Sequence, residues 1–545
     1  MLDILVSQLI APPLQNSPVR LPNSNATEQR PSPKQKEQLE IEVNGQPAAP
    51  PAPVEKQPPP FPAPVKQQPP DIQGLTVYSS EQAASIIKPC LNIVSLNSRL
   101  NQCAADLTAR LVADGYINSR VYVRDTPPSG QLEVVEGVLA DLRVISSNRS
   151  LEKRVSRLLR PLQGRILNIN KIRDQLQLLR RLPDVSDVRG NLSRLGSDAA
   201  QAIFTVNVEA RQAHWQGELS LRNDGSPGTG EYRGAAALLK ADIGTPGDIF
   251  LIYGEMNWTN DPTLGSSISS ASYTYPLNTN LNLTGSLGYT SNDAPEFDTK
   301  TTNIYSDQIQ GLLQMEYVLK DTLSERWSVF AGFSANQNSI SLAIKNSEGL
   351  SATQNSSYLR FGVAGNGAHG SAAWSGSAYF LQGLSGTYID AGNAHAIGGL
   401  VSAGLSLSPT VQANGRLGGQ VALGTLPTSM FFSVGSDIGI RGLPGQLISG
   451  EDGWVGTAEL AWTIWKNQNS SLQLVPYIGA GGVHTNTQSA SFSDTVGAGG
   501  VLARWLGGEN WLIELGWSQQ FQTDNNLGVW NDWLLDSGLY AQLKY

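Results

Sequence analysis

Residues 211–545 alternate apolar and polar side chains over many short stretches. In 281–289 an apolar side chain or a glycine occupies every second position, and the same holds for 411–421, where Arg416 and Gln420 share the polar face. Strict alternation predicts β-strands with one apolar and one polar face. A soluble sandwich of two sheets gives the same pattern, so the alternation predicts an all-β segment and leaves its surroundings open.

The middle of the chain has a different periodicity. Apolar residues recur three to four positions apart within 96–111, which predicts a helix with one apolar face. Two β-type runs follow at 116–123 and 131–135. The order β-α-α-β-β then recurs, so the pattern predicts two small α+β units, at 71–140 and 141–210.

Proline dominates residues 1–70, which hold seventeen of the 31 prolines. Such a segment cannot bury a core and favours an extended, semi-rigid spacer. The first residues, among them Leu2, Ile4 and Leu5, resemble the end of a signal-peptide apolar region, but no basic residue precedes Arg20. We therefore expect either a start site placed too late or a short disordered leader, followed by a Pro-rich linker.

Aromatic residues favour a membrane barrel over a soluble sheet. All 12 tryptophans lie between Trp215 and Trp533, and several stand near the ends of strand-like runs. Tryptophan gathers at membrane interfaces, and long polar side chains suit a water-filled lumen. Transmembrane strands of about 10 residues, with their loops, divide 211–545 into on the order of 16 strands. The sequence predicts a mainly β fold, with this transmembrane antiparallel β-barrel behind two α+β domains and a Pro-rich tail.

Charge and reactive side chains exclude several kinds of chemistry. A formal net charge of −8 gives no electrostatic reason to expect nucleic acid as a partner. Two cysteines exclude a four-cysteine zinc site, and four scattered histidines do not suggest a metal cluster. No Ser/His/Asp or Cys/His constellation has the spacing of a nucleophilic site. We therefore expect no metal, no cofactor and no enzymatic activity.

Residues 432–443 read Phe-Ser-Val-Gly-Ser-Asp-Ile-Gly-Ile-Arg-Gly-Leu. They resemble the segment around Val-Arg-Gly-Tyr/Phe in the two-partner secretion transporters of TpsB type, the ShlB/FhaC/HecB haemolysin secretion/activation family. Asn-Asp-Gly at 223–225 is similar to the start of that family's barrel. The family combines POTRA domains with an outer-membrane barrel. The resemblance implies a first POTRA domain at 71–140, a second at 141–210 and the barrel at 211–545.

In that family the arginine of the motif lies at the tip of a long loop that folds back into the barrel. There it pairs with an aspartate on the inner wall. The resemblance places this loop around 436–452 and its motif at Ile440, Arg441, Gly442 and Leu443. It implies that the loop gates the pore, whereas a solvated loop arginine is the alternative.

The aspartate of the family stands in a Phe-x-Asp-x-Gly strand. The corresponding strand here contains Tyr477, Gly479 and Gly481, so that Gly479 occupies the expected aspartate position. A guanidinium inside a barrel still needs carboxylate or carbonyl acceptors. Glu459 and Glu514 lie in strand-like runs, and we expect Arg441 to be anchored by one of them.

Two further pairs of residues carry expectations. Cys90 and Cys103 either form a disulfide in an oxidising periplasm or leave Cys103 as an ordinary buried thiol. The chain ends on an alternating strand with Leu543 and Tyr545. The resemblance implies that these two residues form a C-terminal insertion signal for the barrel assembly machinery.

The resemblance implies a translocation pore for one large, unfolded exoprotein that is TpsA-like, of the haemolysin or filamentous adhesin type. POTRA domains would capture this partner in part by β-augmentation, because exposed sheet edges offer backbone donors and acceptors. Outer-membrane lipid would surround the barrel. The family's plug helix could only be Pro33–Ile41, which is short. Two alternatives stay open: a factor that inserts barrel proteins, for which two POTRA units are few, and a passive porin, which would not need a periplasmic module.

Overall fold

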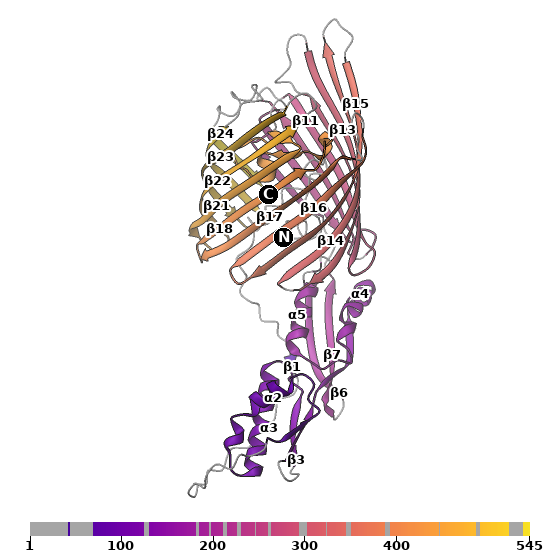
Figure 1. Cartoon of the computed structure of the whole chain (residues 1–545), viewed down its shortest axis with the longest axis vertical. Helices are drawn as coiled ribbons and strands as arrows, with labels where there is room; N and C mark the ends of the chain where they lie inside the picture. Colours follow the sequence, from indigo (N-terminus) through magenta and orange to yellow (C-terminus); the bar gives the residue numbers. More distant parts are fainter. Residues whose placement is uncertain are drawn as a thin grey trace. The chain divides into compact units, whose positions relative to one another are not determined.

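The computed structural model of the chain describes most of its 545 residues (Figure 1). The described residues are 42–43, 69–124, 130–180, 182, 185–195, 198–210, 215–225, 230–245, 247–259, 263–293, 302–322, 324–344, 350–386, 393–445, 447–486, 491–508, 510–522 and 538–545. The expected leader, almost all of the expected Pro-rich linker and the expected plug helix lie outside these ranges. Contacts divide the described residues into an α+β unit that ends at 210 and a β unit that begins at 215.

The first α+β domain packs helices against a three-stranded sheet. Its elements are β2 (Asp71–Gln73), α2 (Ser80–Ile87), η1 (Cys90–Asn92), α3 (Leu96–Ala113), β3 (Arg120–Arg124) and β4 (Gln131–Val135). The strand order is β2-β4-β3, with β2 parallel and β3 antiparallel to β4. The apolar face predicted for 96–111 forms the core, where Leu100, Leu107 and Leu111 are buried together with Leu132 of β4.

Helix α3 ends in a left-handed cap, and the next strand begins only after this cap. Gly115 has a φ of +97°, and Tyr116 donates its backbone N–H to the carbonyl of Leu111 over 2.8 Å. This closes the last helical turn as glycine caps do. Residues 116–119 therefore belong to the cap and the turn after it, and the strand predicted at 116–123 starts only at Arg120.

The second α+β domain has the same order of elements. They are β5 (Val138–Ile145), α4 (Arg149–Leu159), η2 (Arg160–Leu162), α5 (Ile169–Arg180), β6 (Val185–Leu195) and β7 (Asp198–Ala210). Leu151 and Val155 of α4 and Leu176 of α5 are buried with Phe204 of β7 in one core. Strand β5 begins at Val138, so the sheet of this domain starts before residue 141.

One edge of the second sheet carries a segment from far upstream in the chain. Strand β1 (Glu42–Val43) pairs in parallel with Asn191 and Leu192 of β6, which gives the strand order β1-β6-β7-β5. The edge of β6 therefore accepts an extended segment as an added strand.

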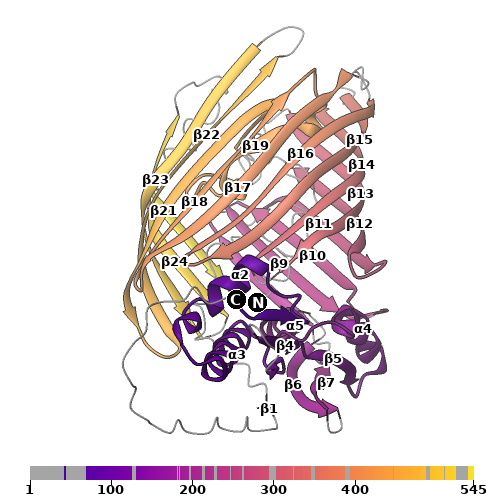
Figure 2. The ribbon, with the colours of Figure 1, turned by 60° about the horizontal axis from the view of Figure 1, so that its bottom comes forward.

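The β unit is a closed barrel of sixteen strands, in which each strand pairs antiparallel with its neighbours (Figures 1 and 2). Its strands are β8 (Gln216–Arg222), β9 (Tyr232–Ala241), β10 (Ile249–Trp258), β11 (Leu264–Pro276), β12 (Leu281–Asp293), β13 (Thr302–Asp321), β14 (Glu325–Ile344), β15 (Leu350–His369), β16 (Ala372–Gly386), β17 (His395–Ser408), β18 (Val411–Ala422), β21 (Asp452–Lys466), β22 (Ser470–Asn486), β23 (Ser491–Gly507), β24 (Trp511–Gln522) and β25 (Leu539–Lys544). The predicted fold class is confirmed, including the number of strands.

Alternation along each strand separates an outer face from an inner face. Leu417 and Val421 of β18 are more than half exposed, whereas Gln420 between them is buried toward the lumen. Tryptophans such as Trp462 and Trp517 are also about half exposed on the outside. Within the described residues no helix is both long and apolar enough to cross a membrane.

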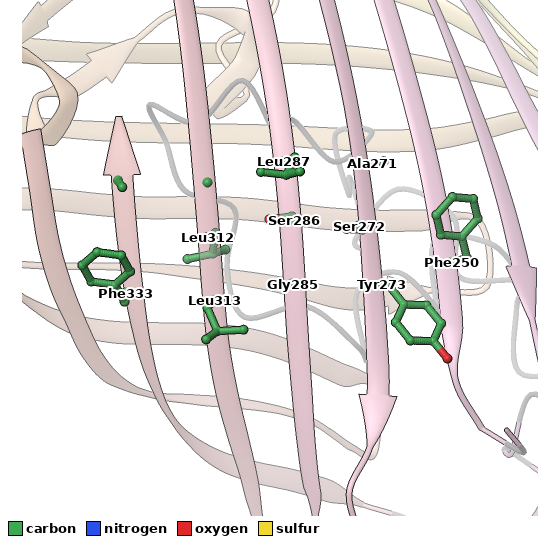
Figure 3. Close-up of a pocket in the computed structure, with 12 residues that line it drawn as sticks. Phe250, Ala271, Ser272, Tyr273, Gly285, Ser286, Leu287, Leu312, Leu313 and Phe333 are labelled. Atoms are coloured by element: carbon green, nitrogen blue, oxygen red, sulfur yellow. The ribbon is translucent and has the colours of Figure 1, made fainter. Parts of the chain in front are cut away.

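The outer wall also has an apolar hollow of about 500 Å³ across strands β10 to β14. Figure 3 shows Phe250, Tyr273, Leu313 and Phe333 along neighbouring strands, and Gly285 also lines the hollow. Leu313 and Phe333 are half exposed, so the hollow faces outward. Its lining is that of a lipid-facing wall.

The two ends of the barrel differ in their connections. The chain enters β8 and leaves β25 at the same end, where neighbouring strands are joined by short turns such as 370–371 and 409–410. At the opposite end lies the longest connection, 423–451, between β18 and β21. Short turns at one end and longer loops at the other are typical of outer-membrane barrels.

Candidate functional site

Connection 423–451, which we call the inward loop, folds into the barrel. Its elements are η5 (Thr428–Met430), β19 (Phe432–Val434), η6 (Ser436–Ile438) and β20 (Ile448–Gly450). Strands β19 and β20 form a small antiparallel hairpin, and Figure 2 shows β19 within the ring of barrel strands. Apolar residues of the loop form one buried cluster with four residues of the inner wall, Val455, Val483, Val496 and Ala498. Apolar packing therefore holds the hairpin in the lumen.

Arg441 stands in the segment that connects β19 to β20, and its side chain lies between two carboxylates of the wall. Its Nη1 donates to Oε2 of Glu514 on β24 over 2.5 Å, and its Nε donates to Oε2 of Glu459 on β21 over 3.3 Å. The Arg441 side chain is 8% exposed and that of Glu514 is 0% exposed. The structure thus brings the motif arginine to both glutamates that the sequence nominated.

Arg504 of β23, which was not among the residues expected from the sequence, completes the cluster. Its Nε donates to Oε1 of Glu514 over 2.6 Å, and its Nη2 donates to Oε2 of Glu459 over 3.4 Å. Strand alternation marked Arg504 as inward-facing, because it stands between the outward-facing residues Ala503 and Trp505. In the structure it pairs across strands with Glu514. Arg441 of the loop and Arg504 of the wall therefore face Glu459 and Glu514 in one buried cluster.

Gly479 has no carboxylate, and the space beside it is filled by the loop itself. A Cβ atom at Gly479 would lie 3.2 Å from Cγ2 of Ile440 and 3.1 Å from Cγ2 of Thr457. A Cβ atom at Gly481 would lie 2.7 Å from Cγ1 of Val434. The apolar side chains of the loop therefore pack closely against the two wall glycines. The carboxylates that bind Arg441 stand on β21 and β24, not at position 479.

The other motif residues hold the loop tip in place. Gly442 has a φ of +79°, and a Cβ atom there would lie 2.0 Å from Oγ of Ser518, so only glycine fits. Its carbonyl accepts a hydrogen bond from the Gln520 side chain. Leu443 is buried in the loop cluster, and the Tyr477 hydroxyl lies beside Gly442.

The remaining predicted residues lie away from this cluster. Cys90 and Cys103 are joined by a disulfide that ties η1 to α3 in the first α+β domain. Leu543 pairs with Leu221 where β25 closes the barrel on β8, and Tyr545 exchanges backbone hydrogen bonds of 2.9 Å with Leu219. Among the described residues no group of three His, Cys, Asp or Glu side chains could hold a metal ion.

Comparisons with known proteins agree with this architecture. The family model described as haemolysin secretion/activation protein ShlB/FhaC/HecB matches residues 203–503, and the model of the ShlB-type POTRA domain matches residues 70–137. CdiB from Escherichia coli is 15% identical, with a TM-score of 0.66 over 88% of this chain and 90% of its own. CdiB from Acinetobacter baumannii is 16% identical, with a TM-score of 0.60 over 93% of this chain and 94% of its own. No curated protein sequence matches the chain.

Proposed function

The chain belongs to the haemolysin secretion/activation family ShlB/FhaC/HecB, and from this premise we propose how it exports one large exoprotein. It is a two-partner secretion pore of the outer membrane, with its POTRA domains in the periplasm. The partner is a TpsA-like protein of the haemolysin or filamentous adhesin type, which passes through the barrel in extended form. The observation that carries this proposal is an inward loop fixed by buried ion pairs to the wall of a sixteen-stranded barrel.

Capture of the partner begins at the edge of β6. Backbone groups at a sheet edge bind any extended chain, and β1 already pairs there with Asn191 and Leu192. A segment of the exoprotein would add to this edge in the place of Glu42–Val43. Because the backbone makes the contact, the edge tolerates many sequences, which suits a partner that arrives unfolded.

The inward loop closes the pore until the partner arrives. Its apolar residues are seated on the wall glycines Gly479 and Gly481, and Arg441 joins it to Glu459 and Glu514. Passage of an extended chain requires that the loop move, so these contacts set how tightly the resting pore is shut. Deletion of 436–452 should raise the resting conductance strongly.

The barrel itself depends on two further partners. Its outer face, rich in exposed leucine and tryptophan, contacts outer-membrane lipid. The C-terminal strand with Leu543 and Tyr545 is read by the barrel assembly machinery during insertion. Replacing Tyr545 with serine should lower the amount of barrel in the membrane without changing the loop cluster.

Comparative mass spectrometry of culture supernatant and outer membrane, with and without the gene, tests the function. We expect one large extracellular protein to disappear while the membrane stays unchanged, and complementation with the wild-type gene to restore it. Depletion of many barrel proteins from the membrane would instead identify an insertion factor. No change in either fraction would leave a passive porin and overturn the proposal.

A further inference from the structure

A second ion-pair cluster joins the inward loop to the wall at Asp437, four residues before Arg441. Oδ1 of Asp437 in η6 accepts a hydrogen bond from Nη1 of Arg233 in β9 over 2.6 Å. The Nη2 of the same arginine donates to Oε2 of Glu255 in β10, also over 2.6 Å. The Arg233 side chain is 3% exposed and that of Asp437 is 19% exposed, so the arginine side of this contact is shielded from water.

The two anchors lie on opposite sides of the barrel closure. Arg441 holds the loop to β21 and β24, whereas Asp437 holds it to β9. Between β24 and β9 stand only β25 and β8, which close the barrel. These two strands share three registered pairs, whereas β9 and β10 share ten. The loop therefore ties the wall together across its shortest strand pairing.

Charge balance indicates that Asp437 serves the loop and not the wall. Arg233 already has Glu255 as a carboxylate partner, and Arg222 of the wall lies 3.3 Å from Asp224. These wall charges balance without the loop, so the wall does not need Asp437.

The segment between the anchors is also held. Nη1 of Arg416 in β18 donates to the carbonyl of Ile438 over 2.6 Å, and Gly439 with a φ of +108° turns the chain toward Arg441. A Cβ atom at Gly439 would lie 2.6 Å from Nη1 of Arg416. The close fit fixes the spacing of the two anchors along the loop.

We propose that Asp437 is a second positioning residue of the inward loop, which binds Arg233 and keeps the loop in the lumen when the Arg441 anchor is broken. The loop then leaves the lumen only after both anchors break. The inference rests on the proposed function, in which the loop closes the pore. It adds that the loop is released only after both anchors have broken.

Four purified full-length variants in lipid vesicles test the proposal: Asp437→Asn, Arg441→Ala, the double variant, and Glu316→Gln as the matched control. Glu316 is a buried wall acid that pairs with Arg326 and, among the described residues, with none of the inward loop. Hydrogen exchange of the backbone amides at 436–443 directly measures how firmly the two anchors hold the loop. We expect slow exchange in both single variants and at least tenfold faster exchange in the double variant. Equal exchange in the double variant and Arg441→Ala would overturn the proposal.

Planar-bilayer conductance of the same variants measures the gate separately. We expect the control Glu316→Gln to stay within twofold of the wild type, and the double variant to conduct more than Arg441→Ala. Asp437→Glu combined with Arg441→Ala should return the conductance to that of Arg441→Ala, because the carboxylate is restored. A further outcome is that exchange rises in the double variant while deletion of 436–452 leaves the conductance unchanged. In that case Asp437 does hold the loop, as proposed here, but the proposed gating role of the loop is wrong. Heat-modifiable gel mobility confirms that each barrel is folded.

Discussion

Ile440 of the inward loop packs directly over Gly479 of the barrel wall, at the position where the family resemblance led us to expect an aspartate. Its Cγ2 would lie 3.2 Å from a Cβ atom at Gly479. An apolar contact therefore replaces a charged one at this point of the wall. The carboxylates that Arg441 needs come from β21 and β24.

The first prediction reverses this replacement. Gly479→Asp should push Ile440 off the wall and raise the resting conductance several-fold, because the new carboxyl group needs the space that the Ile440 side chain fills. Gly479→Ala requires a shift of only a few tenths of an ångström and should stay close to the wild type. Adding Ile440→Ala to Gly479→Asp should lower the conductance again. A Gly479→Asp pore as tight as the wild type would contradict the packing argument.

The two glutamates of the cluster should differ in their contribution to stability. Glu514 is fully buried and accepts the two shorter bonds, 2.5 Å from Arg441 and 2.6 Å from Arg504. Glu514→Gln leaves two buried guanidinium groups with one carboxylate and should cost about 3 kcal/mol or more. Glu459→Gln should cost less, since its bonds to the arginines are longer, at 3.3 and 3.4 Å. Urea unfolding in lipid vesicles, followed by tryptophan fluorescence, measures both, and equal losses would count against this ranking.

Removal of the disulfide should destabilise the first POTRA domain without affecting the barrel. Cys90 and Cys103 are separated by 13 positions, and closing a loop of this length contributes about 3 kcal/mol through the unfolded chain. We expect the double variant Cys90→Ser/Cys103→Ser to be cleaved by trypsin much faster within 69–137. Its gel mobility as a folded barrel should remain unchanged. Unaltered proteolysis would show that packing of α3 alone suffices.

The stability of the same domain should fall at strongly alkaline pH. Burial raises the pKa of Tyr78 to about 12, helped by a hydrogen bond of 2.7 Å from its hydroxyl to Asp114. Because the folded pKa lies above the unfolded value of about 10, the stabilisation is complete below pH 10 and is lost as the pH rises toward 12. The difference in absorbance at 295 nm between wild type and Tyr78→Phe should therefore contain one late-titrating tyrosine. A difference curve centred at pH 10 would exclude this hydrogen bond.

The architecture follows from patterns that are local in the sequence. A period of two sends Leu417 and Val421 outward and Gln420 inward whatever the strand pairs with, and a period of three to four gives α3 its buried face. The predicted ends of helices and strands are less accurate next to a helix cap, as at Gly115. Such a cap depends on backbone conformation and not on hydrophobicity.

The charged contacts of the inward loop depend on where a long connection lies in three dimensions. Glu459 and Glu514 could be nominated because a buried arginine needs carboxylates, yet the pairing of both with Arg441 and with Arg504 at once required the strands in register. Arg233 and Asp437 are separated by 204 positions, and no pattern in the sequence links the two. Strand alternation thus sets which side chains face the lumen, because it is a property of each strand alone. Only the closed barrel and the path of the loop decide which of those side chains meet, because an ion pair forms between atoms that tertiary structure brings within a few ångströms.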